Sequence, residues 1–217
     1  MARGLFITFE GIDGCGKSTQ IRRAEEHLQS LGLRCVVTRE PGGTPIGEKI
    51  REVLLARQHG EMCNAAELLL YLAARAQHVA EKIRPSVEQG AVVLCDRFQE
   101  ATFAYQGWGR GYDGKLLERL NAFATGGCAP DHTFILDIPV AEAFERMKKA
   151  GKTADRLEQN SMEFYDKIRR GYRALAAANA GRITLVDACG TIEQTAALIC
   201  RRLDVLVSGR GKETAAG

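Results

Sequence analysis

Five short runs of apolar residues recur along the chain, each four or five residues long. They cover residues 5–9, 35–38, 91–95, 133–137 and 183–186. Within each run the apolar residues are nearly continuous instead of alternating with polar ones. This pattern is typical of strands in a parallel sheet that is covered on both faces. We therefore predict five buried parallel strands.

Longer segments with apolar residues at helical spacing separate these runs. We predict helices over residues 17–31, 46–56, 65–88, 115–125, 140–150, 161–179 and 192–207. The alternation of strands and helices predicts an α/β fold with a doubly wound, five-stranded parallel sheet flanked by helices. Ligands of such sheets bind beyond the carboxyl ends of the strands, which puts Glu10, Arg39, Asp96 and Asp137 near the functional edge.

The rest of the pattern indicates one domain. No internal repeat or low-complexity linker divides the 217 residues, so we predict a single domain over residues 1–207. The polar, glycine- and alanine-rich stretch 208–217 is predicted to be a frayed tail. The glycine-rich stretch 107–114 is typical of a mobile surface loop.

Composition excludes several classes of protein. Hydrophobic residues make up 45% of the chain, which excludes disorder and fibrous repeats. Lys and Arg number 30 against 27 Asp and Glu, a near balance that argues against a nucleic-acid-coating protein. No apolar run approaches the roughly 18 residues of a membrane span, and the first residues lack a signal-peptide pattern. Seven widely spaced cysteines without a CxxC pair, and four histidines without metal spacing, predict reduced thiols and a cytoplasmic location.

The strongest motif begins where the first predicted strand ends. Residues Gly11 to Ser18 read GIDGCGKS and match the phosphate-loop pattern GxxxxGK[ST] between a strand and a helix. Its glycines let backbone N–H groups turn inward around an anion, and the following helix presents its positive end. Lys17 supplies a charge for the β- and γ-phosphates, and the Ser18 hydroxyl can ligate Mg²⁺. The predicted ATP-binding residues are Gly11, Ile12, Asp13, Gly14, Cys15, Gly16, Lys17, Ser18 and Thr19.

A phosphate loop alone is compatible with GTPase switches, ATPases and small-molecule kinases. The chain lacks the Asn-Lys-x-Asp tetrapeptide that selects guanine, which weakens a GTPase. It also lacks the basic patch or second domain expected of a helicase or motor. A compact acceptor site, and hence a small-molecule kinase, fits one domain best.

Two further motifs follow predicted strands. Asp96 and Arg97 end the third strand, where an acidic residue typically supports Mg²⁺ and an arginine can neutralise a phosphoryl group in transfer. Arg39 ends the second strand and is followed by Glu-Pro-Gly-Gly, a turn that would hold a phosphate-binding arginine at the sheet edge. A salt-bridged strand end and an ordinary turn are the structural alternatives.

Weaker signals lie on the helical segments. Tyr71 and Arg75 are four residues apart on one helix face, a pair that suits a flat base with a carbonyl acceptor. From the pattern alone, however, core packing is the better explanation of an aromatic at this spacing. A basic run at 147–158 fits a cationic lid that excludes water, with a solvated loop as the alternative.

Taken together, these motifs resemble those of bacterial thymidylate kinases, P-loop nucleoside monophosphate kinases that phosphorylate dTMP with ATP. The likeness covers roughly residues 4–207. Four blocks carry it in order: the loop from Phe9 to Thr19, the turn Thr38-Arg-Glu-Pro-Gly-Gly, Asp96-Arg-Phe with Ala104-Tyr-Gln-Gly, and Asp155-Arg-Leu-Glu. The resemblance implies a P-loop fold, ATP and Mg²⁺, the product dTDP for dTTP biosynthesis, and a homodimer formed through the 65–88 region.

The resemblance also implies roles for matched positions. Asp13 would meet the 3′-hydroxyl side of the deoxyribose, and Arg39 and Arg97 would hold the dTMP phosphate. Tyr71 would stack on thymine, and Arg75 would donate to a thymine carbonyl. The wall that senses the base and the missing 2′-hydroxyl would consist of Thr102, Tyr105 and Gln106.

Two positions depart from the family pattern. The phosphate loop carries Gly14 and Cys15 instead of an arginine, and such members usually supply a catalytic arginine from the lid. Lysines occupy lid positions where arginine is common, which leaves Arg146 and Arg156. We predict Arg156 to act beside Lys17 and Arg97 as the catalytic cations. Ala101 stands where serine is frequent, so one polar contact near the base is expected to be missing.

Two rival hypotheses remain from the sequence. One is a P-loop kinase for another nucleotide or nucleoside. The other is a non-enzymatic nucleotide-binding switch, which would need neither the Tyr71 and Arg75 pair nor the Arg-Glu-Pro-Gly-Gly turn.

Overall fold

The computed structural model describes residues 3–151 and 161–213. Its five strands confirm the predicted ones and form one sheet in the order β2-β3-β1-β4-β5, in which every neighbouring pair is parallel. The strands are β1 (Leu5–Glu10), β2 (Cys35–Arg39), β3 (Val92–Asp96), β4 (His132–Asp137) and β5 (Ile183–Asp187). The predicted α/β fold with a five-stranded parallel sheet is therefore confirmed.

Every predicted helical segment contains helix, but residues 99–109, where no helix was predicted, are helical as well. The helices are α1 (Lys17–Ser30), α2 (Pro45–Leu55), α3 (Asn64–His78), α4 (Arg84–Glu88), α5 (Gln99–Thr102), α6 (Gly114–Thr125), α7 (Val140–Lys149), α8 (Met162–Ala178) and α9 (Ile192–Glu213). A short 3₁₀ turn, η1 (Arg57–His59), precedes α3, and two π-helical segments are η2 (Val79–Ile83) and η3 (Phe103–Gly109). The segment predicted as one helix over 65–88 runs through α3, η2 and α4.

Side chains cap the starts of three helices, α2, α6 and α8. Thr44 accepts a hydrogen bond from the Gly47 N–H at the start of α2, and Pro45 occupies its first turn. Asp113 and Ser161 cap α6 and α8 in the same way. These caps satisfy backbone donors that a helix end would otherwise leave without partners.

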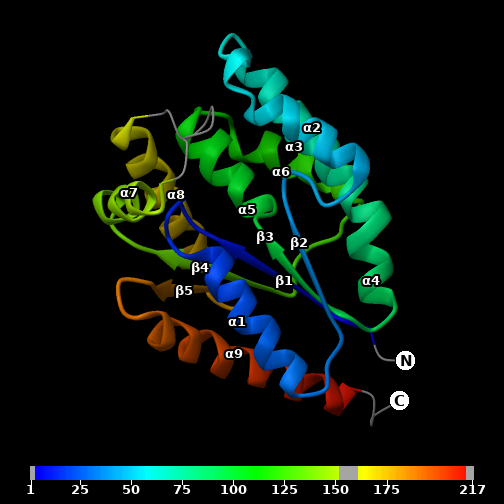
Figure 1. The fold of residues 1–217 in the computed structure, drawn as a ribbon. Coiled ribbons are helices and arrows are strands. Elements are labelled where there is room, and N and C mark those ends of the chain that lie inside the picture. Colours follow the sequence, from blue (N-terminus) through cyan, green and yellow to red (C-terminus); the bar gives the residue numbers. More distant parts are fainter. Residues whose placement is uncertain (1–2, 152–160, 214–217) are drawn as a thin grey trace.

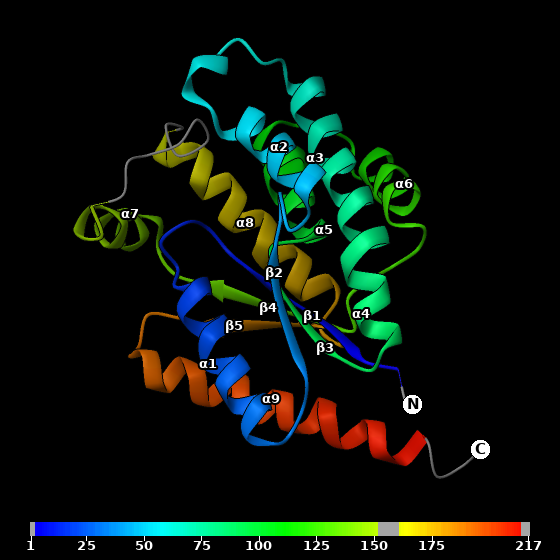
Figure 2. The ribbon, with the colours of Figure 1, turned by 45° about the vertical axis from the view of Figure 1, so that its right-hand side comes forward.

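Helices cover both faces of the sheet. α1 and α9 lie side by side on one face, whereas α8, α4 and α5 lie on the other (Figures 1 and 2). The largest apolar cluster fills the space around the central strand β1, with Phe9, Phe134 and Tyr172 among its members. No helix in the two described ranges is long and apolar enough to cross a bilayer.

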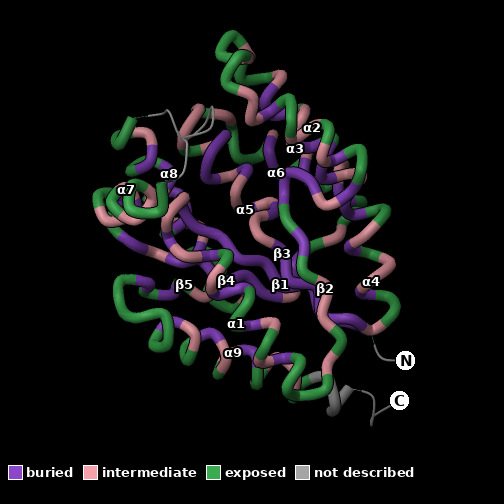
Figure 3. Tube along the Cα trace, in the orientation of Figure 1, coloured by how far each residue is buried: buried purple, intermediate pink, exposed green. Residues whose placement is uncertain are grey.

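Burial along the sheet corrects one prediction. The central strands β1, β3 and β4 are almost wholly buried, as Figure 3 shows in purple. The two edge strands β2 and β5 are only partly covered, and Val37 and Leu185 on them are exposed. The apolar runs predicted burial on both faces but carried no information about which strands would form the edges.

Three other boundaries differ from the predictions. The stretch 107–114 is not a loop throughout, because Gly107 to Gly109 belong to η3 and Gly114 begins α6. The last helix continues through residue 213, so the first part of the predicted tail is helical. The predicted lid starts at residue 147, but α7 extends to Lys149, and residues 152–160 lie outside the described part of the chain.

Candidate active site

The carboxyl ends of the strands gather polar side chains at one edge of the sheet. Glu10, Arg39, Asp96 and Asp137 are the last residues of β1, β2, β3 and β4. In the parallel register Asp96 is paired with Phe9 on one side and Arg39 on the other. Two of the four expected residues line a cavity at this edge, Arg39 and Asp96, whereas Glu10 and Asp137 are engaged elsewhere.

This cavity has a volume of about 550 Å³. Most of the predicted site residues line it together, although they come from five separate stretches of the chain. They are Asp13, Gly14, Gly16, Lys17, Ser18, Thr19, Arg39, Tyr71, Arg75, Asp96, Arg97, Thr102, Tyr105 and Gln106.

The phosphate loop adopts a conformation that only glycine permits at two points. Gly11 and Gly14 have φ of 131° and 81°, and a Cβ at these positions would lie 2.5 Å from the Leu136 oxygen and 2.4 Å from the Ala143 oxygen. The Lys17 ammonium donates to the backbone oxygens of Gly11 (3.0 Å) and Ile12 (3.2 Å). The side chain of Lys17 therefore folds back against the backbone of the phosphate loop.

Three predicted loop residues, Gly11, Ile12 and Cys15, are buried and do not line the cavity. The side chains of Ile12 and Cys15 belong to the main apolar cluster. Burial raises the pKa of the Cys15 thiol, so this group stays protonated at neutral pH. Any contact of these residues with a nucleotide is limited to their backbone atoms.

Arg97 occupies the centre of the charged groups in the cavity. Its Nη2 donates to Asp13 Oδ1 (2.6 Å), and its Nη1 donates to the Gly11 oxygen (3.0 Å). The Tyr105 ring lies under the guanidinium at 5.1 Å, and its hydroxyl donates to Asp13 Oδ2 (3.2 Å). Although burial opposes ionisation, the Arg97 and Lys17 cations lower the pKa of Asp13 to about 2. Asp13 is therefore an anion that orients two neighbouring side chains.

Asp96 supplies the acidic group next to the phosphate loop. Its Oδ1 is buried and makes no hydrogen bond to the described residues. Ser18, with its hydroxyl, lines the same cavity. One carboxylate and one hydroxyl fit Mg²⁺, which keeps several water ligands and takes few from the protein. No cluster of three His, Cys, Asp or Glu side chains suited to another kind of metal site occurs among the described residues.

Arg39 and Tyr71 form the outer wall. Arg39 is exposed and donates to Glu48 Oε2 (3.1 Å), while Glu48 Oε1 accepts from the Gly43 N–H (2.8 Å). The half-buried Tyr71 lines the cavity from α3. Glu48, which lies in the first part of α2, therefore connects the Arg39 side chain to the Pro-Gly-Gly turn.

Arg75 lies deeper, with only 1% of its side chain exposed. Its Nε donates to Glu40 Oε2, its Nη1 donates to Thr102 and Asn121, and its Nη2 donates to the Phe98 oxygen. These contacts use four of the five N–H groups of the Arg75 guanidinium. One Nη2 hydrogen is left without an acceptor among the described residues, and Arg75 lines the cavity.

The predicted base wall is built from buried side chains. Thr102 accepts from Arg75, Tyr105 donates to Asp13, and Gln106 donates from its Nε2 to Glu67 Oε1 (3.0 Å). The π-helical segment η3 presents Tyr105 and Gln106 to the cavity.

Comparison with known proteins decides between the hypotheses. The family model for thymidylate kinase matches residues 9–199. The chain belongs to the thymidylate kinase family. It is an ATP-dependent nucleoside monophosphate kinase that transfers a phosphoryl group from ATP to dTMP.

Individual relatives agree with this membership. A thymidylate kinase of Pelotomaculum thermopropionicum is 51% identical over 186 residues, which cover 86% of each chain. One of Syntrophotalea carbinolica is 47% identical over 203 residues, covering 91% of this chain and 92% of the relative. The crystal structure of thymidylate kinase from Ehrlichia chaffeensis superposes with a TM-score of 0.76 at 34% identity, covering 93% of this chain and 99% of that one. The thymidylate kinase hypothesis is therefore supported over another acceptor or a switch.

This thymidylate kinase site also contains residues that the sequence did not single out. Glu40 and Arg51 line the cavity, and Arg51 donates to the Pro41 oxygen (2.8 Å). Arg146, considered only as a lid cation, lines the cavity from α7 and donates to the Ala188 oxygen (2.9 Å). Glu40 follows Arg39 directly in the turn motif, which is the signal that could have identified it. The predicted catalytic Arg156 lies outside the described residues.

Proposed function

We propose that the cavity holds the ATP phosphates on the loop from Gly11 to Thr19 and dTMP against Arg39, Arg75 and Arg97. The observation that carries this assignment is the convergence of Lys17 and these arginines, from four elements, on one cavity. Phosphate groups of the two nucleotides bring several negative charges, and guanidinium groups bind phosphate bidentately. Asp13, held as an anion, is positioned to accept from a sugar hydroxyl.

The proposed reaction needs no general base. An oxygen of the dTMP phosphate attacks the γ-phosphorus in line, the bond from this phosphorus to the ADP oxygen breaks, and dTDP forms. A phosphate monoester is already anionic near neutral pH. Lys17, Arg97 and Arg156 act by positioning and by neutralising charge on the group in transfer.

Ser18 and Asp96 are the residues that we propose to hold Mg²⁺. When bound, the ion would neutralise negative charge on the phosphates of ATP. The buried, unpartnered Asp96 Oδ1 supports this assignment.

Thymine selection rests on the inner end of the cavity. Tyr71 is proposed to stack on the base, and the remaining Nη2 hydrogen of Arg75 to donate to a thymine carbonyl. Because the other four N–H groups of Arg75 have fixed acceptors, its donor direction is set before the base binds. Tyr105, Thr102 and Gln106 complete the wall.

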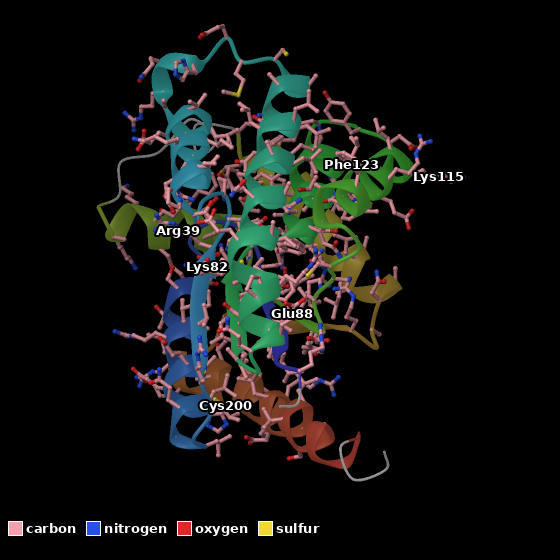
Figure 4. All side chains as sticks on the ribbon, turned by 90° about the vertical axis from the view of Figure 1, so that its right-hand side faces the viewer. Arg39, Lys82, Glu88, Lys115, Phe123 and Cys200 are labelled. Atoms are coloured by element: carbon pink, nitrogen blue, oxygen red, sulfur yellow. The ribbon has the colours of Figure 1, made fainter. Side chains whose placement is uncertain are left out.

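We also propose a homodimer that uses α3 and the neighbouring α6. Leu69 on α3 is 59% exposed and Phe123 on α6 is 89% exposed. Figure 4 shows Phe123 and Lys115 on the outer side of α6. Large exposed apolar side chains of this kind mark interaction surfaces. Sedimentation should give a dimer for the parent and a monomer for Leu69→Glu with Phe123→Glu. The exposed Val205 on α9 provides the control, because Val205→Glu should remain dimeric.

A cytoplasmic location is proposed from the thiols. All seven cysteines are free, which suits a reducing compartment.

The decisive experiment for the site measures ADP and dTDP formation with purified protein, Mg²⁺ and ATP. The acceptors are dTMP, dUMP, dCMP, dGMP, AMP and thymidine. We expect strong stimulation by dTMP, and a loss of at least about 100-fold in turnover for Lys17→Ala. Stimulation by dCMP equal to that by dTMP would overturn the role of Arg75. Near-normal turnover by Lys17→Ala would overturn the phosphate-loop mechanism.

A further inference from the structure

Arg97 has a backbone conformation that costs free energy. With φ of 69°, it is the one non-glycine residue in the described ranges with a positive φ. This region is unfavourable for a residue with a side chain, and such strain persists where surrounding contacts over-determine it. The contacts that hold Arg97 in place therefore indicate which residues its position depends on.

The first of these contacts are to the main chain. The Arg97 N–H donates to the Phe9 oxygen (2.9 Å), and the next amide, Phe98 N–H, donates to Glu10 Oε1 (2.7 Å). Glu10 is fully buried at the end of β1. One oxygen of its carboxylate therefore fixes the peptide that follows the strained residue.

The second set of contacts is to the guanidinium. Arg97 Nη1 donates to the Tyr172 hydroxyl (3.3 Å), and this hydroxyl donates to Glu10 Oε2 (2.8 Å). Tyr172 projects from α8 and is almost fully buried. The two oxygens of Glu10 thus hold both the backbone and the side chain of Arg97, the latter through Tyr172. Neither Glu10 nor Tyr172 lines the cavity.

We propose that Tyr172 and Glu10 are positioning residues that aim the Arg97 guanidinium at the phosphoryl group in transfer. The Arg97 guanidinium can only donate to the hydroxyl, and the single hydroxyl proton is directed at Glu10 Oε2. This directional chain keeps Arg97 Nη1 beside the phosphate loop while Nη2 is held by Asp13. The inference rests on the role proposed above for Arg97.

The electrostatic cost of Glu10 supports a functional reason for its presence. Burial, together with the nearby Glu100, raises the pKa of Glu10 to about 8, although Arg97, the Phe98 N–H and Tyr172 oppose this shift. A neutral glutamine of the same shape could accept from the Phe98 N–H without that cost. It would present an N–H group to Tyr172, however, and the direction of the chain would be lost.

The test compares three variants with the parent. Tyr172→Phe removes one oxygen and should lower kcat about tenfold, since a lost hydrogen bond to a charged group changes a barrier by roughly that factor. The KM for ATP and the unfolding temperature should change little. Glu10→Gln should also lower kcat, and the double variant should be no slower than Tyr172→Phe alone, because both act through one contact. Tyr112→Phe is the matched control. Tyr112 is half-buried, and its hydroxyl makes no hydrogen bond to the described residues.

Arg97→Ala separates the two proposals. If Arg97→Ala turns over like the parent, the role of Arg97 fails and the inference fails with it. If Arg97→Ala loses at least about 100-fold while Tyr172→Phe and Glu10→Gln keep the parent kcat, only the inference is wrong. A loss of stability with unchanged kcat in the last two variants would likewise show a structural role and overturn it. Should Tyr172→Phe fail to fold, Glu10→Gln carries the same test.

Discussion

Arg75 and Glu40 form a buried ion pair in the wall of the candidate active site. Arg75 Nε lies 2.7 Å from Glu40 Oε2, and both side chains are no more than 3% exposed. The other carboxylate oxygen contacts His78 Nδ1 (3.0 Å), and His78 Nε2 contacts Thr38 Oγ1 (2.7 Å). The position of Arg75 is thus fixed by residues of β2, of the turn after it, and of α3.

The first prediction concerns this pair. Arg75→Met leaves the Glu40 carboxylate buried without its main partner and should lower the free energy of unfolding by about 3 kcal/mol. Adding Glu40→Gln removes the charge and should restore at least about 1 kcal/mol of that loss. Urea unfolding of both variants and of Glu40→Gln alone measures the coupling. Additive effects of the two substitutions would contradict the prediction.

The second prediction concerns Asp96. Replacing its carboxylate by an amide in Asp96→Asn removes the negative charge beside Ser18. We expect turnover at saturating ATP to fall about 100-fold and the half-saturating Mg²⁺ concentration to rise. Glu88→Gln is the matched control, because Glu88 is an exposed carboxylate on α4 that does not line the cavity. An unchanged Mg²⁺ requirement in Asp96→Asn would remove Asp96 from the proposed metal site.

The third prediction follows from the sign of the Glu10 shift. The pKa of Glu10 is raised from 4.5 to about 8 in the folded protein, first by burial and then by Glu100. The unfolded chain therefore gives up this proton at lower pH, and Glu10 costs stability progressively as pH rises from 4.5 through 8. Glu10→Gln should gain stability relative to the parent between pH 5 and pH 9, measured as the difference in urea midpoint. A difference that does not change with pH would refute the shift.

The fourth prediction concerns His132 on β4. Burial, with Arg202 and Arg182 nearby, lowers its pKa from 6.5 to about 4, while its Nε2 contacts Thr184 Oγ1 (2.9 Å). The unfolded chain takes up the proton first, so stability is lost as pH falls from 6.5 towards 4. His132→Gln should lose about 1–2 kcal/mol less stability than the parent between pH 7 and pH 5. Equal acid sensitivity in chemical denaturation would assign the loss to other groups.

The sequence predicted the fold because its signals are local. Each strand is a mostly apolar run, and each predicted helix carries its own apolar periodicity, so Leu5 to Glu10 or Lys17 to Ser30 can be found without knowledge of the rest. The phosphate loop is likewise a single stretch between two such elements. Asp96 and Arg39 were found for the same reason, since the carboxyl ends of parallel strands share an edge.

The supporting contacts could not be found in this way, because they join distant positions. Tyr172 and Glu10 are 162 residues apart, and His78 and Glu40 are 38 apart. No spacing rule connects a tyrosine on one helix with a glutamate before the phosphate loop. Edge exposure of β2 and β5 was missed for a related reason, since strand order is a property of the assembled sheet.

Helix α8 has a consequence for how the rate of this enzyme can vary. Phe164 at its start packs edge-on against Tyr105, Arg169 holds Asp137 at the end of β4, and Tyr172 holds Arg97. Helix α8 therefore supports Tyr105 and Arg97 in the cavity wall, and Asp137 at the neighbouring strand end, although none of its own residues lines the cavity. Two relatives with identical motifs can therefore differ in kcat through substitutions on the inner face of α8 alone. Evolutionary changes in turnover are best sought on that face.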